Sequence, residues 1–194
     1  MQNIKYFYFA YLCIFSSCGS DNNAATNITN QNTEIQKIFT LGGTKNESGQ
    51  SVVKTPDGGY AVLGYTQSTD LDVLNKTNNS YDYWLIKFDA FGNQEWQKVY
   101  GGSDDDRGQE IINSSDGGYA IIGSSKSQDG DVSLNYGFND FWVLKISNSG
   151  NLIWEKSFGY SGSDNGFSII QTQDNGYLII GVIDVTSSDG QGNN

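Results

Sequence analysis

Short runs of apolar residues, separated by polar turns, recur along the chain from about residue 42 onward. The stretch 101–158 holds one complete set of these runs. The predicted strands in this set are residues 109–113, 119–124, 141–146 and 152–158. Asp-Gly between two apolar runs marks a tight hairpin, because glycine adopts the positive φ angle that such turns need. The pattern therefore predicts four antiparallel strands, the last one more polar and outermost, and no long helix.

The chain repeats this pattern about two and a half times. Trp84 and Trp142 lie 58 positions apart, and so do Trp96 and Trp154. A fixed period of this kind predicts stacked copies of one structural unit. The copies span about 42–100, 101–158 and, incompletely, 159–194. The residues expected to serve the repeat itself are Gly59, Tyr60, Asp82, Trp84, Trp96, Gly118, Tyr119, Asp140, Trp142, Trp154, Gly176 and Tyr177.

Three motifs in each copy carry a resemblance to a known family. Gly-Gly or a single Gly precedes a polar or acidic loop, Asp-Gly-Gly-Tyr or Asp-Asn-Gly-Tyr forms the first hairpin, and the next strand ends in glycine. Over residues 41–194 these motifs resemble the bacterial β-propeller repeat lipoproteins of the seven-bladed type. The resemblance implies an all-β fold of four-stranded antiparallel blades. The chain departs from the family pattern in the tryptophans of its third strands and in a period near 58.

The repeat domain is expected to begin near residue 34. Residues 35–39 resemble the last strand of a repeat, and the final copy stops before its third strand. Propellers close with about four to eight blades. Two and a half copies therefore predict an open arc with unpaired edges, which favour aggregation. The expected explanation is a chain that is incomplete relative to a closed propeller; the alternative is a short chain that assembles with copies of itself.

The first 17 residues are expected to be a signal peptide. Lys5 precedes an apolar run over 6–15 that is too short to span a bilayer. Ser16-Ser17-Cys18 then resembles a bacterial lipobox, which implies lipid attachment at Cys18 and a place in the outer membrane, possibly at the cell surface. The alternative is an ordinary signal peptide with an incidental cysteine. Residues 18–33, rich in Asn, Thr and Ser, are expected to form a flexible tether.

The amino-acid composition excludes several kinds of partner, catalytic mechanism and metal site. The chain has 22 Asp+Glu, 11 Lys+Arg and no histidine, with a net charge of −11. An acidic chain argues against nucleic-acid partners and against electrostatic binding to anionic lipid. The lack of histidine excludes Ser-His-Asp and Cys-His catalysis and most zinc or copper sites. Because Cys18 is expected to be acylated, no disulfide is expected in the mature chain, and any metal site must use oxygen ligands.

The acidic loops are candidates for calcium, which prefers six to eight oxygen ligands. The residues concerned are Asp104, Asp106, Asp129 and Asp131. None of these loops has the full EF-hand pattern. The competing interpretation is a solvated turn in which each aspartate caps backbone N–H groups. No other cofactor is expected.

Asp82 and Asp140 directly precede the third strands and are expected to bond backbone amides there. Trp96 and Trp154 are expected to pack between blades rather than to stack on sugars. Lys87 and Lys145, in the middle of the third strands, are expected to pack their stems while the ammonium reaches an aspartate or water.

These observations favour a non-enzymatic module that binds or displays an extracellular protein or glycan through loops on one face. Two alternatives stay open. Residues 171–177, Gln-Thr-Gln-Asp-Asn-Gly-Tyr, faintly resemble the motif of bulb-type mannose lectins, which implies carbohydrate binding. A propeller glycan hydrolase would need one pair of carboxylates at a defined separation, whereas here the acidic residues repeat. A purely structural spacer is the third class.

Overall fold

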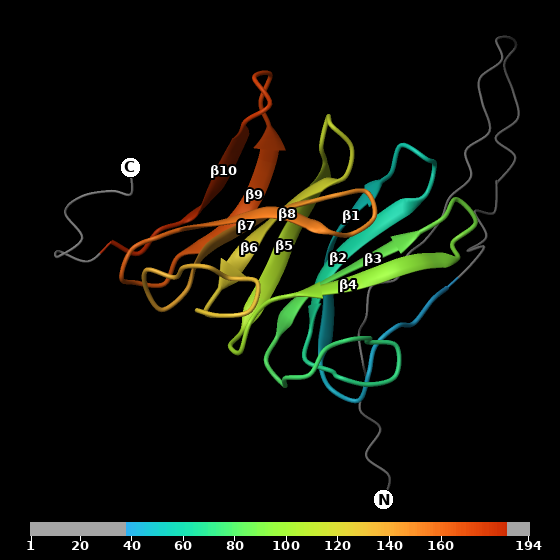
Figure 1. Cartoon of the computed structure of the whole chain (residues 1–194), viewed down its shortest axis with the longest axis horizontal. Helices are drawn as coiled ribbons and strands as arrows, with labels where there is room; N and C mark the ends of the chain where they lie inside the picture. Colours follow the sequence, from blue (N-terminus) through green and yellow to red (C-terminus); the bar gives the residue numbers. More distant parts are fainter. Residues whose placement is uncertain (1–37, 186–194) are drawn as a thin grey trace, which may run out of the picture.

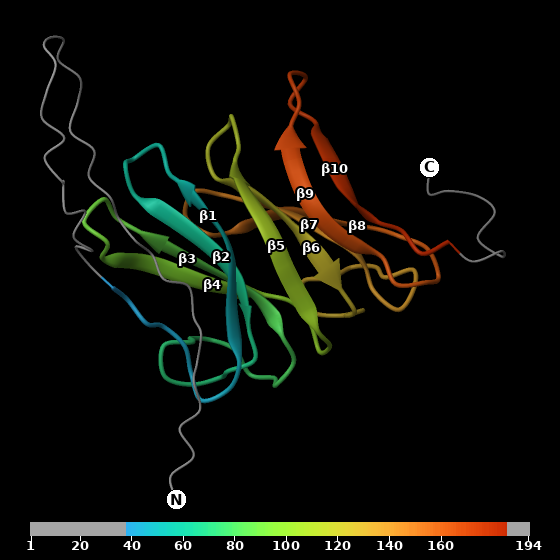
Figure 2. The same ribbon diagram turned by 180° about the vertical axis from the view of Figure 1, so that it is seen from behind.

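The computed structural model describes residues 38–185 of the 194-residue chain. Within this range the protein is all-β, and its ten strands form three antiparallel sheets of four, four and two strands, none of them closed. The three sheets stand in a row, with β1–β4 at one end and β9–β10 at the other (Figures 1 and 2). The described residues contain no helix long and apolar enough to cross a membrane.

The first sheet follows the chain order β1-β2-β3-β4. Its strands are β1 (Glu47–Lys54), β2 (Tyr60–Thr66), β3 (Asp82–Phe88) and β4 (Gln94–Tyr100). The turn between β1 and β2 contains Gly58 at φ +88°, and the turn between β3 and β4 contains Gly92 at φ +77°. Only glycine adopts these angles without strain, so the predicted hairpin turns are confirmed.

The second sheet repeats the first in order and register. Its strands are β5 (Asp106–Asn113), β6 (Tyr119–Ser125), β7 (Asp140–Ile146) and β8 (Leu152–Phe158). Trp142 lies opposite Gly123 just as Trp84 lies opposite Gly64. A Cβ at either glycine would collide with a carbonyl oxygen of the first strand, that of Ser48 or Arg107. The register shifts also recur at equivalent places, Lys87/Phe88 in one sheet and Lys145/Ile146 in the other.

The third sheet pairs only β9 (Asn165–Gln171) with β10 (Tyr177–Val182). Within the part of the chain that the structure describes, no strand pairs with the outer edge of β10. On one face of β10 the apolar side chains of Leu178, Ile180 and Val182 are more than half exposed. The equivalent positions in β6 include Ala120 and Ile122, which are completely buried against the third sheet. The outer face of the third sheet is therefore uncovered.

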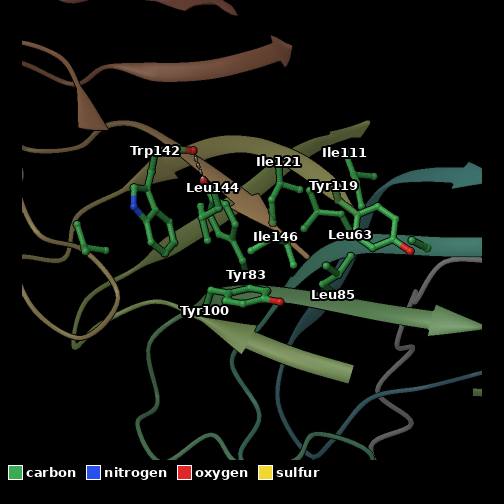
Figure 3. Close-up of a cluster of buried hydrophobic side chains, with 12 residues drawn as sticks. Leu63, Tyr83, Leu85, Tyr100, Ile111, Tyr119, Ile121, Trp142, Leu144 and Ile146 are labelled. Carbon is green, nitrogen blue, oxygen red and sulfur yellow. Dashed lines mark hydrogen bonds between the residues drawn. The ribbon is translucent and has the colours of Figure 1, made fainter. Parts of the chain in front are cut away.

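The main core lies between the first and second sheets. Figure 3 shows its side chains converging from β2, β3 and β4 on one side and from β5, β6 and β7 on the other. The rings of Tyr83 and Trp142 meet edge to face with centroids 4.8 Å apart, and the Tyr83 hydroxyl donates to the Trp142 carbonyl over 3.1 Å. A second cluster of the same kind, around Ile122 and Ile169, joins the second and third sheets.

The predicted strands are confirmed with small changes in their bounds. Residues 152–158 form β8 as predicted, and β7 starts one residue earlier than expected. Asp106 was expected before the first strand of its repeat, but it is the first residue of β5, because it pairs with Ser125 and extends the ladder. The predicted strand over 35–39 is wrong where it can be seen: Ile38 and Phe39 are not in a strand. The ring of Phe39 instead packs 5.9 Å from that of Phe88.

The signal peptide, Cys18 and the tether lie outside the described residues, and so do residues 186–194 of the third repeat. Predictions about them stay predictions. The fourth strand of the first sheet ends at Tyr100 and that of the second at Phe158, while the predicted repeat bounds stay predictions.

Candidate functional site

A groove of about 950 Å³ opens between the second and third sheets, beside the free edge of β10. Strands β7 and β8 form one wall, β9 and β10 the other, and the β5–β6 turn closes one end. The groove is mixed in character, with aromatic and aliphatic side chains among polar ones. Its lining residues are Ser115, Asp116, Val143, Lys145, Trp154, Lys156, Phe158, Gln171, Asn175, Gly176, Tyr177 and Ile179.

The equivalent space between the first two sheets is filled by the β7–β8 hairpin. The turn of this hairpin packs on the first sheet, where a Cβ at Gly150 would stand 3.0 Å from the indole of Trp96 and 2.9 Å from Lys98. The Tyr100 hydroxyl donates to the Gly150 carbonyl over 2.9 Å. Leu144, Ile146 and Leu152 of the hairpin belong to the main core. At the first junction, therefore, a β-hairpin with a glycine in its turn fills the groove.

The groove beside β10 lacks this filling, and the exposed fractions of matching residues differ accordingly. Tyr100 is 4% exposed, whereas its counterpart Phe158 is 39% exposed. Ile121 is completely buried, whereas its counterpart Ile179 is only partly buried. The apolar wall of the groove is therefore built for a contact that the described residues do not supply.

The space around the glycine in the first hairpin turn of each sheet also differs between the first two sheets and the third. A Cβ at Gly59 would lie 2.1 Å from the Phe88 carbonyl oxygen, and one at Gly118 would lie 2.2 Å from the Ile146 carbonyl oxygen. These oxygens belong to the ends of the third strands. A Cβ at Gly176 would meet nothing closer than 3.0 Å, because residues 38–185 place no third strand in this sheet.

Trp154 and Tyr177 meet at the floor of the groove. Their ring centroids lie 5.8 Å apart at 63°, which repeats the 6.2 Å and 61° of Trp96 and Tyr119. The Tyr177 hydroxyl lies 2.9 Å from the Ser114 hydroxyl. The expectation that these tryptophans pack between sheets is confirmed. Trp154 remains partly exposed and lines the groove.

The polar side chains around the groove are engaged in contacts between the second and third sheets and within the second sheet. The Ser115 amide donates to Gln171 over 2.8 Å, and the Ser115 hydroxyl donates to Asn175 over 3.1 Å. Lys145 forms an ion pair with Asp116 at 2.9 Å and donates to the Gly117 carbonyl. The lectin-like segment 171–177 thus borders the groove, but its amide oxygens hold the neighbouring sheet.

The lysines in the third strands confirm the packing predicted for them. Lys87 is buried and forms ion pairs with Asp57 at 2.8 Å and with Glu95 at 2.6 Å. Burial lowers the pKa of Lys87, but the hydrogen bonds to these two carboxylates outweigh it, and the net pKa is raised. The hydrogen bond from Lys87 holds the pKa of Asp57 well below its ordinary value. These are contacts within the first sheet and reach no groove.

The four calcium candidates are used largely as caps of the backbone. Asp129 accepts from the Ser103 amide over 2.6 Å, and Asp131 accepts from the Gly101 amide over 3.1 Å. Asp106 is buried and accepts from the Gly102 amide over 2.8 Å. The backbone amide of Asp104 donates to Ser127. Among residues 38–185, no group of three or more His, Cys, Asp or Glu side chains is placed to hold a metal ion. Calcium binding by these four residues stays a prediction.

Asp82 and Asp140, at the starts of β3 and β7, are both buried. Asp140 accepts from the Tyr136 amide over 2.6 Å, as expected. Asp82 does not bond an amide as predicted; it accepts from the Ser80 hydroxyl and pairs at 3.1 Å with Lys76, a lysine in the middle of the loop 67–81. Burial raises the pKa of Asp82 to about 6 and that of Asp140 to about 6.

Sequence analysis missed the groove, and with it Lys156 and Phe158. Both stand in β8, which reads from the sequence as an ordinary outer strand. Aligning β8 with β4 gives the missing signal: Lys98 and Tyr100 occupy the same positions and are covered by the next hairpin. A comparison with protein-family models finds no match, and a comparison with curated protein sequences finds none either.

Proposed function

We propose that this chain is a non-enzymatic binding module of the bacterial cell envelope, tethered to the outer membrane by a lipid on Cys18, and that its groove beside β10 receives a β-hairpin from another polypeptide. The two four-stranded sheets would be blades of an open propeller-like arc. The single observation that carries the proposal is the first junction, where the β7–β8 hairpin occupies the equivalent groove.

The mode of binding would be strand addition. Among the described strands, none pairs with the outer edge of β10, so its backbone groups are open to an incoming strand. Main-chain hydrogen bonds to such an edge provide affinity, and side-chain pockets provide specificity. In the second sheet β6 pairs with β7 from Tyr119 to Ser125. An incoming strand would pair in the same way with β10, and its turn would lie on Trp154 as Gly150 lies on Trp96.

The test uses the purified full chain and a labelled synthetic peptide of residues 139–158, which contains β7, its turn and β8. We expect binding with a Kd of about 1–100 µM by fluorescence anisotropy. Hydrogen exchange should show new protection in β10, because its amides gain partners. A peptide carrying Gly150→Val should bind at least about tenfold more weakly, since its turn could not approach Trp154.

A matched protein variant separates binding from folding. Gly176→Ala should leave the melting temperature nearly unchanged, because a Cβ there meets nothing closer than 3.0 Å. It should nevertheless weaken the peptide, because an incoming third strand would place a carbonyl against that Cβ, as at Gly59 and Gly118. Equal binding of both peptides, or no protection of β10, would contradict the proposal.

A glycan is the second candidate for the same groove. The aromatic pair of Trp154 and Tyr177 favours it, since aromatic faces pack on sugar rings. The amide oxygens of Gln171 and Asn175 disfavour it, because they already bond Ser115. Binding of soluble oligosaccharides that is lost in Trp154→Ala, without any binding of the hairpin peptide, would support the glycan instead.

A further inference from the structure

A pair of buried aspartates recurs where one sheet meets the next. At the first junction Asp106 of β5 faces Asp82 of β3, and a Cβ at Gly101 would lie 2.6 Å from the Asp106 carboxylate and 2.8 Å from that of Asp82. Asp106 is completely buried and Asp82 is 4% exposed. Two carboxylates that both border Gly101 in the interior repel one another unless a positive charge or a proton accompanies them.

The second junction repeats the pair in the same backbone frame. A Cβ at Gly159 would lie 2.4 Å from Oδ1 of Asp140 and 2.5 Å from Oδ2 of Asp164. Both aspartates are completely buried. The Asp164 amide donates to the Asn139 carbonyl, just as the Asp106 amide donates to the Tyr81 carbonyl.

A lysine supplies the positive charge at the first junction only. The Lys76 ammonium lies 3.1 Å from Oδ2 of Asp82, and its side chain is 1% exposed. It also donates to the Asn78 carbonyl and side chain. This ammonium is a tethered cation held by oxygen atoms inside the molecule.

The second junction lacks that lysine. The loop over 126–139 is one residue shorter than the loop over 67–81, and its single lysine, Lys126, lies 4.5 Å from the ring of Phe138 instead. Within residues 38–185, neither Asp140 nor Asp164 forms an ion pair with a lysine or arginine. The Asp164 carboxylate accepts from the Tyr160 and Asp184 amides. Among the described residues, Oδ1 of Asp140 is buried and accepts no hydrogen bond, as is also true of Oδ1 of Asp106 at the first junction. A buried charge in this state is costly.

We propose that Asp140 and Asp164 bind a hard metal cation, Na⁺ or Ca²⁺, which takes the place that the Lys76 ammonium has at the first junction. Carboxylate oxygens are the ligands that these ions prefer. Two protein carboxylates are too few to complete the coordination shell, so backbone carbonyls and water supply the other ligands. The cation joins the second sheet to the third, since one aspartate belongs to each. This site is separate from the groove and does not depend on the proposed function.

The test measures the melting temperature of the full chain after exhaustive chelation and exchange into tetramethylammonium chloride. Addition of CaCl₂ or NaCl at matched ionic strength should raise the melting temperature by at least about 4 °C. Asp140→Asn should remove this response, because its side chain is neutral and its oxygen can still accept from the Tyr136 amide. Isothermal titration of the chelated protein with CaCl₂ and with NaCl then shows which ion binds.

Lys76→Met is the matched variant at the first junction. It should create a second cation response there, because it leaves the Asp82–Asp106 pair in the same condition as the Asp140–Asp164 pair. The double variant Asp129→Asn/Asp131→Asn should keep the original response. A response that survives in Asp140→Asn, or that vanishes in the double variant, would overturn the proposal. So would the absence of any response when acidification alone stabilises the protein, since a proton would then neutralise the pair.

Discussion

The β7–β8 turn rests directly on the first sheet: a Cβ at Gly150 would stand 3.0 Å from Cζ3 of Trp96. Gly150 also has φ +78°, an angle that side chains rarely adopt. The contact limits how closely the second sheet approaches the first. A larger side chain at Gly150 would disturb the apolar interface between the two sheets.

Gly150→Val should therefore lower the free energy of unfolding by roughly 2 to 4 kcal/mol, from backbone strain and from overpacking against Trp96. Urea denaturation checks this value. Gly117→Ala is the matched control, because Gly117 has φ +84° but nothing within 4 Å of a Cβ. It should cost only the backbone strain, about 1 kcal/mol. Equal losses in the two variants would mean that Trp96 does not limit the approach.

Tyr83→Phe should destabilise the protein by about 1 kcal/mol, because the Trp142 carbonyl loses a buried donor across the sheet junction. Tyr81→Phe removes a hydroxyl whose hydrogen bond with Asn46 is exposed, and it should change stability little. Thermal unfolding of both variants at neutral pH makes the comparison. A loss for Tyr83→Phe no larger than that for Tyr81→Phe would contradict the assigned role of this bond.

Stability should rise as the pH falls from about 7 to about 5. Burial raises the pKa of Asp140 from 3.8 to about 6, with the Asp164 carboxylate adding to the rise. The native state therefore binds a proton more tightly than the unfolded chain, and its contribution is complete near pH 4 and lost as the pH rises through 6. We expect roughly 1 to 2 kcal/mol from Asp140 after allowing for screening by solvent.

Asp140→Asn should reduce this pH dependence in metal-free buffer, with the remainder due to groups such as Asp82, whose pKa burial also raises to about 6. The variant should be more stable than the unmodified chain at neutral pH. Guanidinium titrations at several pH values measure both effects. Below about pH 4 the comparison loses meaning, because carboxylates such as Asp57, whose pKa is lowered, begin to lose their stabilising contacts. An unchanged slope in the variant would show that other groups cause the dependence.

Asp129→Ala should cost about 1 kcal/mol through the lost hydrogen bond from the Ser103 amide. If the acidic loop serves only as a cap, this cost is the same in calcium and in EDTA. A cost that grows when calcium is present would support the calcium hypothesis for Asp104, Asp106, Asp129 and Asp131. Differential scanning calorimetry of the two proteins in both buffers separates the outcomes.

Cys18→Ser should abolish acylation and release the protein from the membrane fraction. In bacteria expressing the chain, we expect the unmodified form to incorporate labelled palmitate and to accumulate as an unprocessed precursor when globomycin blocks signal peptidase II. Unchanged processing and fractionation of the variant would favour an ordinary signal peptide with an incidental cysteine.

The strands and turns could be predicted from the sequence because they depend on local signals. Asp-Gly turns and apolar runs fixed β6, β7 and β8 to within about one residue, which is the accuracy that such signals allow at strand ends. The groove could not be predicted in the same way. It depends on which hairpin covers Phe158, and that is a relation between sheets rather than a property of β8.

The contacts of Asp82 and Asp140 could not be predicted from the repeat pattern either. Asp82 and Asp140 occupy identical places in the repeat, so the sequence suggested one role for both. The loop before Asp82 carries Lys76 in its middle, whereas the only lysine of the loop before Asp140 is its first residue, Lys126, which lies against Phe138. Whether a buried aspartate is paired with a lysine depends on the side chains of its own loop, which differ between the copies. The shared repeat pattern therefore does not predict the pairing.

The shared register of the first two sheets bears on how the gene can change in length. Trp84 and Trp142 stand 58 codons apart in equivalent places, and some contacts of the first junction recur at the second, such as the Trp96–Tyr119 ring pair in the form of Trp154–Tyr177. Duplication or deletion of 58 codons, wherever the break falls, would join a strand to its own equivalent. Repeat proteins of this kind are stabilised mainly by contacts between neighbours. Recombination can therefore add or remove whole sheets while each remaining neighbour contact is preserved.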